Sequence, residues 1–150
     1  MVAYSFQSRF AEPILAGAKG GTIRAPRRNP SAIRAEFGGH AWPDETLQLY
    51  TGMRTKHCRR ISDRKCLATT RILLCFGTTV GEPEIVVHDE VYKRFRSTAD
   101  LDAFARFDGF ADFADMAAFW HVGRTPGGPY LDVFDGWHIR WLPLPDLADA

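Results

Sequence analysis

A lysine and a threonine lie three residues apart near the start of the chain, in the segment Lys19-Gly20-Gly21-Thr22. An amine held away from water loses its charge readily and can then accept the proton of a hydroxyl, which turns the hydroxyl oxygen into a nucleophile. The spacing therefore predicts a base and nucleophile pair formed by Lys19 and Thr22. A solvated lysine beside a turn explains the same residues, and at this point both interpretations stay open.

A carboxylate, Asp108, precedes Gly109 between two apolar runs that repeat with the helical period. This pattern predicts two short helices within residues 98–120. Asp108 either caps the N-terminus of the second helix or is a buried partner for a lysine. The large apolar residues of the second run are interpreted as core: Phe110, Phe113, Met116, Phe119 and Trp120.

A basic stretch follows an aromatic residue in segment 50–60. Tyr50 offers a ring on which a base can stack, and the cations that follow offer charge for phosphates, as in single-stranded nucleic-acid grooves. The stretch therefore predicts a nucleic-acid surface, with an ordinary basic surface loop as the alternative. Its candidate binding residues are Tyr50, Arg54, Lys56 and Arg59, to which Arg24, close to Thr22, is added.

The distribution of charge agrees with a basic surface in the first half of the chain. Residues 1–71 hold thirteen lysines and arginines against five acidic residues, and residues 72–150 hold six against thirteen, although the net charge is only +1. Such asymmetry attracts phosphates to one face of a small protein. Two solvated faces that neutralise each other would have the same composition.

Histidine and cysteine spacings do not predict a metal site. His40 and His57 have no partner at a ligand spacing, so they are interpreted as surface or hydrogen-bonded residues. Cys58, Cys66 and Cys75 are odd in number and lack the paired gaps of a zinc site, so we expect reduced, structural thiols.

Hydrophobic periodicity and turn residues predict an α+β chain. Helices are expected within residues 6–17, from Ser31 through residue 37 and twice within 98–120; strands are expected at 22–25, 46–51, within 65–80, at 84–92 and at 133–142; a Gly/Pro loop covers 125–129. Helices do not regularly separate these strands, as a parallel sheet would require. The prediction is a small, closed or nearly closed β-barrel with flanking helices.

The length of 150 residues, with 45% hydrophobic residues, is that of one domain with one core. The sequence contains neither an apolar run long enough for a membrane span nor the build of a secretory signal at its start. We therefore expect a single domain over 1–150, in the cytoplasm and without a membrane partner.

The order of these motifs resembles the ASCH family, which is related to the PUA-like RNA-binding barrels. The resemblance rests on Pro-Ile-Leu-x-Gly before Lys19, Leu-Gln-Leu-Tyr-Thr-Gly around Tyr50, Cys-Arg-Arg-Ile from Cys58, and Asp108-Gly-Phe before Phe-Trp at 119–120. It implies a PUA-like barrel of about five or six strands, with flanking helices and a basic cleft.

One bacterial branch of this family removes the acyl group from N4-acetylcytidine with a lysine, a threonine three residues later, and a glutamate on the helical segment. Lys19 and Thr22 match that spacing, and the glutamate position falls on Asp108, which is one methylene shorter. The resemblance thus implies an amidohydrolase whose substrate is a modified nucleoside and which needs no cofactor. Lys19 would take the proton of Thr22, Thr22 would attack the amide carbonyl, and Asp108 would orient the lysine or help to protonate the leaving amine.

Other bacterial members cleave single-stranded RNA with a divalent ion's help, and many PUA-like barrels only bind RNA. For a ribonuclease assisted by Mg²⁺, Tyr50 would orient the RNA and Lys56 would hold the scissile phosphate. The sequence therefore leaves three functions open: an amidohydrolase, which we favour, a ribonuclease, and a non-catalytic RNA-binding module.

Overall fold

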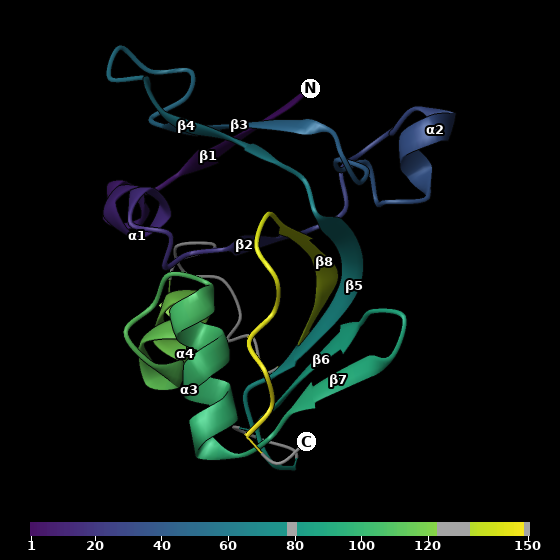
Figure 1. The fold of residues 1–150 in the computed structure, drawn as a ribbon, viewed down its shortest axis with the longest axis vertical. Helices are drawn as coiled ribbons and strands as arrows, with labels where there is room; N and C mark the ends of the chain where they lie inside the picture. The colour runs from purple at the N-terminus through teal and green to yellow at the C-terminus, as the bar shows by residue number, and fades with distance from the viewer. Residues whose placement is uncertain (78–80, 123–132, 149–150) are drawn as a thin grey trace.

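The computed structural model describes residues 1–77, 81–122 and 133–148, and Figure 1 shows their arrangement. The described chain is a mixed α+β fold with two sheets, one of three strands and one of five. Helices α3 (Thr98–Phe107) and α4 (Phe113–Val122) lie beside the five-stranded sheet.

The three-stranded sheet is built entirely from the basic first half of the chain. Its strands are, in spatial order, β1 (Val2–Phe6), β3 (Thr46–Thr51) and β4 (Arg59–Lys65). β1 runs parallel to β3, whereas β3 and β4 are antiparallel and joined by the loop at residues 52–58. β1 is therefore one open edge of this sheet, and β4 is the other.

The five-stranded sheet is antiparallel and takes one strand from the first half. Its spatial order is β2 (Gly21–Arg24), β8 (Val133–Arg140), β5 (Ala68–Cys75), β6 (Glu84–His88) and β7 (Tyr92–Phe95). β2 pairs only with β8, so Thr22 lies on an edge strand.

Short helical segments precede β2 and β3. A 3₁₀ turn, η1 (Ser8–Phe10), leads into α1 (Ala11–Leu15), and α2 (Ala32–Ala35) follows the loop after β2. The Ser31 side chain caps α2 by accepting a hydrogen bond from the backbone N–H of Arg34, as expected for serine at this position.

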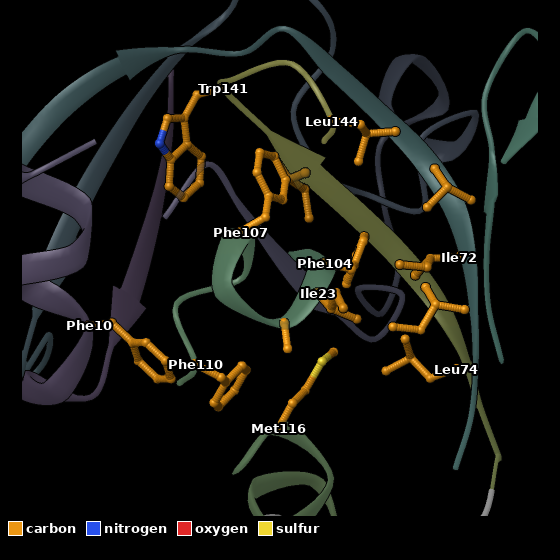
Figure 2. Packing of buried hydrophobic residues seen from close by; sticks show 14 of the residues in the cluster. Phe10, Ile23, Ile72, Leu74, Phe104, Phe107, Phe110, Met116, Trp141 and Leu144 are labelled. Atoms are coloured by element: carbon orange, nitrogen blue, oxygen red, sulfur yellow. The ribbon is translucent and has the colours of Figure 1, made fainter. Parts of the chain in front are cut away.

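Side chains of α3 and α4 pack on one face of the five-stranded sheet to form the main core. In Figure 2, Phe104 of α3 and Met116 of α4 point toward Ile23, Ile72 and Leu74 of the sheet. Phe104 and Met116 are completely buried. Their burial holds α3 in place, and α3 ends at the residue that matters most for the site, Asp108.

The sequence predicted the α+β class and the two helices within 98–120 correctly. Among the described residues the strands form two separate sheets, with no ladder that closes a barrel. Three strands, β1, β4 and β7, were not anticipated. β4 carries almost no apolar residues and is held at the edge of its sheet by pairing with β3.

The expected loop at 125–129 lies outside the described residues. In the described part of the chain, no helix combines the length and hydrophobicity that crossing a membrane requires.

Candidate active site

The backbone around Lys19 is positioned by the end of α1 and by the far end of the chain. Gly17 adopts a left-handed conformation (φ 76°), and the backbone N–H groups of Ala18 and Lys19 both donate to Pro13 O at 2.9 Å. The carbonyl of Lys19 then accepts a hydrogen bond from the indole N–H of Trp141 at 3.1 Å. These contacts fix where the lysine side chain leaves the backbone.

The side chain of Lys19 meets Asp108, 89 residues further along the chain. Its Nζ lies 3.4 Å from Asp108 Oδ1 and also donates to the main-chain oxygen of Asp108. Lys19 is only 2% exposed and Asp108 only 3%, so the pair is almost completely removed from water. The interpretation of Lys19 as a solvated lysine beside a turn is therefore wrong.

Two glycines allow this close approach. A Cβ at Gly20 would lie 2.4 Å from the ring of Phe107, and the Gly20 N–H donates to the carbonyl of that residue at 2.8 Å. Gly109 has φ 98°, and a Cβ there would meet Lys19 Cδ at 2.8 Å. The segment that carries the lysine and the turn that carries the carboxylate therefore touch through glycine backbone, and any larger residue would separate them.

Asp108 ends α3 and does not cap α4. Its backbone N–H bonds to carbonyls of the last turn of α3, whereas the first turn of α4 is capped by Asp112, which accepts from the N–H of Asp115 at 2.8 Å. Of the two expectations for Asp108, the helix cap is wrong and the buried partner for a lysine is confirmed.

Thr22 lies on β2 and is 4% exposed. Its Oγ1 accepts a hydrogen bond from Nε of Arg24 at 3.1 Å, and Nη2 of Arg24 donates to the carbonyl of Ser5 at 2.8 Å. Because one lone pair of the hydroxyl is occupied by the guanidinium, its own proton is directed elsewhere. Arg24 thus orients Thr22 and links the edge of β2 to the edge of β1.

Lys19, Thr22 and Asp108 line one cavity of about 210 Å³, together with Arg24. The rest of its wall is largely aromatic and includes Phe6, Phe10, Phe110, Phe119 and Trp120. The sequence placed the last three of these rings in the core; Phe110 and Trp120 are indeed buried, yet their surfaces also shape this cavity. The volume is below the ~300–1,000 Å³ of sites for drug-sized ligands, which favours a small planar fragment.

Burial narrows the difference between the pKa of Lys19 and that of Asp108. Desolvation lowers the pKa of Lys19, although the carboxylate of Asp108 opposes this. Desolvation raises the pKa of Asp108 to about 6, against the opposing effect of Lys19. Near neutral pH a proton therefore moves between them at a much smaller cost than between a lysine and an aspartate in water.

Three of the candidate binding residues, Arg24, Arg54 and Arg59, divide between two larger cavities that are both lined by residues of β1. Arg24 and Arg54 line one of about 600 Å³, and Arg59 lines another of about 920 Å³. Ser5 lines both, as well as the cavity of Lys19.

The two residues on which a ribonuclease would depend do not line these spaces, although their chain neighbours Thr51 and Thr55 line the cavity of about 920 Å³. Tyr50 is half-buried near the end of β3, and Lys56 is exposed in the following loop. Neither is among the described residues that line these three cavities.

The histidines and cysteines singled out in the sequence differ in burial, with His40 and Cys66 buried and His57 and Cys58 exposed. His40 is buried between the Tyr4 hydroxyl, 3.0 Å from Nδ1, and Ala25 O, 2.8 Å from Nε2, and burial lowers its pKa to about 4. His57 is exposed, and all three cysteines are free thiols. Within residues 1–77, 81–122 and 133–148, no three histidine, cysteine or acidic side chains are grouped so as to hold a metal ion.

Sequence reasoning did not anticipate the role of Arg24 toward Thr22 or the participation of Ser5. The alternation of Arg24 with Thr22 on one strand signals that they share a face. Because β1 was not predicted, its approach to β2 could not be predicted either.

A scan against protein-family models finds no match, and comparisons with curated proteins and with solved structures find none either.

Proposed function

We propose that this protein is an amidohydrolase that removes the acyl group from N4-acylated cytosine or cytidine, with Thr22 as nucleophile, Lys19 as base and Asp108 as the carboxylate that balances the lysine. The observation that carries the proposal is the convergence of these three side chains on one small cavity. Lys19 comes from the segment before β2, Thr22 from β2 and Asp108 from the end of α3, and Lys19 and Asp108 are almost completely buried as a pair.

The chemistry begins with the neutral form of Lys19. Its amine accepts the Thr22 proton as Oγ1 attacks the amide carbonyl, which gives a tetrahedral oxyanion. When the C–N bond breaks, the ammonium of Lys19 returns a proton to the leaving 4-amino group of cytosine. Water then attacks the resulting ester as Lys19 takes one of its protons. When the ester C–O bond breaks, Lys19 returns that proton to Thr22 Oγ1, and the carboxylic acid is released.

The short side chain at 108 fits this role because the backbone comes closer. Lys19 Nζ reaches both Oδ1 and the main-chain oxygen of Asp108, and Gly109 leaves room for the lysine stem. An aspartate here can balance the ammonium that forms when Thr22 loses its proton, as a longer glutamate would from a more distant backbone.

Arg24 supports the same reaction from the other side of Thr22. Its guanidinium donates to Oγ1, so it favours loss of the hydroxyl proton and stabilises negative charge that develops nearby. The aromatic wall offers faces on which a cytosine ring can stack.

We also propose that the two sheets are an opened form of a PUA-like barrel. The edge strands β1 and β2 are bridged by side chains: Arg24 Nη2 donates to Ser5 O at 2.8 Å and Arg27 Nη2 to Ala3 O at 3.4 Å. In this proposal, the guanidinium groups of Arg24 and Arg27 link β1 and β2 where a closed barrel would have backbone hydrogen bonds between the two strands. The ribonuclease, with Tyr50, Lys56 and Mg²⁺, stays a prediction that no contact favours.

The test is to incubate the purified protein with N4-acetylcytidine, with and without a chelator, and to follow cytidine and acetate by chromatography. We expect turnover that the chelator does not reduce. Thr22→Val removes the hydroxyl and keeps the shape, so it should abolish turnover, whereas Thr22→Ser should retain part of it. Thr46→Val, at an exposed position of β3, is the matched control. A Thr22→Val protein as active as the parent would exclude the mechanism.

A further inference from the structure

We propose that the arginine-lined cavity beside the candidate active site binds a phosphate monoester on the ribose, so that the preferred substrate is an acylated cytidine nucleotide. This inference rests on the proposed function and specifies its substrate class. The cavity of about 600 Å³ is lined by Arg24, Arg27, Arg34 and Arg54. Among the described residues that line it there is no aspartate or glutamate.

The arginine-lined cavity shares lining residues with the cavity of Lys19, Thr22 and Asp108. Ser5 and Arg24 line both. Arg24 donates to the nucleophile candidate Thr22 at 3.1 Å, so the shared wall lies within one side chain of the reacting centre. With the base of a nucleoside in the smaller cavity, the shared wall of Ser5 and Arg24 would direct its ribose and a phosphate toward the arginines.

The arginines differ in how much charge they offer. Arg34 is paired bidentately with Glu45, at 2.7 and 2.6 Å, so its charge is balanced. Arg27 is exposed, lies 5.1 Å from the Tyr4 ring centroid and makes one hydrogen bond of 3.4 Å to Ala3 O, which uses one of the five N–H donors of a guanidinium. Among the arginines of this cavity, Arg27 therefore has the clearest capacity to donate hydrogen bonds to a bound anion.

Arg54 reaches the same cavity through an unusual backbone. It has φ 66°, a left-handed conformation that arginine seldom adopts, and the neighbouring Met53 N–H is tied to Ser5 Oγ at 3.2 Å. The loop between β3 and β4 is therefore anchored to β1 at the point where the two cavities meet. This anchoring brings a cation from a remote loop to the wall that already holds Arg27.

A single phosphate accounts for the charge better than a polynucleotide strand does. Among the described residues that line the cavity of about 920 Å³, the candidate cations are Arg59 and His57, so the cluster of arginines does not continue in the lining of this second cavity. Concentrated donors beside a small base pocket fit one compact dianion, which guanidinium groups bind in fork geometry.

The test compares binding of cytidine 5′-monophosphate with that of cytidine by calorimetry, and kcat/KM for the two acetylated forms. We expect the phosphate to improve both by about tenfold or more, and the improvement to fall to near onefold in Arg27→Gln and Arg54→Gln. Arg28→Gln is the matched control, because Arg28 is an exposed neighbour that does not line the cavity. Binding of the monophosphate is measurable even if no turnover occurs, so failure of the proposed function and failure of this inference are distinguishable.

Three results would overturn the phosphate site. The monophosphate and the nucleoside bind equally; or Arg28→Gln loses as much as Arg27→Gln, which would indicate unspecific attraction; or a short RNA with one acetylated cytidine gains while the monophosphate does not. A 3′-monophosphate measured alongside identifies which ribose position the arginines recognise, and a gain with either monophosphate supports the site.

Discussion

Two acid–base pairs in this protein have opposite electrostatics. Glu45 accepts two hydrogen bonds from Arg34 and one from the N-terminal ammonium, and these donors lower its pKa to about 2. Asp108 has one charged partner, Lys19, at 3.4 Å, and burial raises its pKa to about 6. Glu45 therefore has enough hydrogen-bond donors to stay ionised, and it stabilises the fold. Asp108 is removed from water and receives few donors, as expected for a group that exchanges protons.

The largest effect should come from replacing the Lys19–Asp108 pair by uncharged residues. Lys19→Met combined with Asp108→Asn removes the base and its counter-charge, so deacylation should fall about 10³-fold. The protein should be at least as stable as the parent, because removing both members of a buried pair leaves no charge uncompensated. Activity assays and thermal unfolding check both parts; a large loss of stability would make the pair structural, like that of Glu45.

Replacing Glu45 should show the reverse. Glu45→Gln weakens the bidentate contact with Arg34, so the free energy of unfolding should drop by about 2 kcal/mol at pH 7. The lowered pKa of Glu45 means that its contribution is present above about pH 4.5 and disappears as pH falls toward 2. Denaturant unfolding measures the change, with Glu36→Gln, exposed at the end of α2, as control. An unchanged free energy would contradict the structural role.

The pH profile of deacylation reports on Asp108 directly. The ionised carboxylate balances the ammonium that Lys19 becomes, so kcat/KM should fall about tenfold per pH unit below about pH 6, where Asp108 becomes protonated. In Asp108→Asn the rate should be lower at every pH, and the acid limb should move away from about pH 6, because only protonation of the Lys19 base then limits the rate. If the limb stays near that pH in this variant, another group titrates there.

At neutral pH the smallest effect concerns a buried histidine outside both pairs, because its contribution changes only as the solution becomes acidic. His138 is completely buried between Phe104 and Phe107, and burial lowers its pKa to about 3. The unfolded chain therefore binds an extra proton below about pH 6.5, and stability should decline as pH falls from there toward 3, by up to about 1 kcal/mol per pH unit. His138→Leu should reduce this slope, and His57→Gln, at an exposed position, should retain it.

Local pattern was sufficient for the elements whose apolar faces repeat regularly. The end of α1 just before Gly17, the strand 46–51 and the two helices around Asp108 all follow from periodicity and turn residues. β4 escaped because its residues are polar on both faces, and its extended form depends on hydrogen bonds to β3. β1 escaped because its parallel partner lies more than forty residues away.

The sequence by itself determined which residues have the chemistry: a lysine and a hydroxyl three residues apart, a carboxylate at a glycine turn, and an excess of arginine in the first half. Only the tertiary structure decided that Lys19 is dry, that Asp108 faces it and that Arg24 orients Thr22. The reason is physical, because desolvation and charge pairing depend on groups distant in sequence: Asp108, which opposes the effect of burial on the pKa of Lys19, lies 89 residues from it.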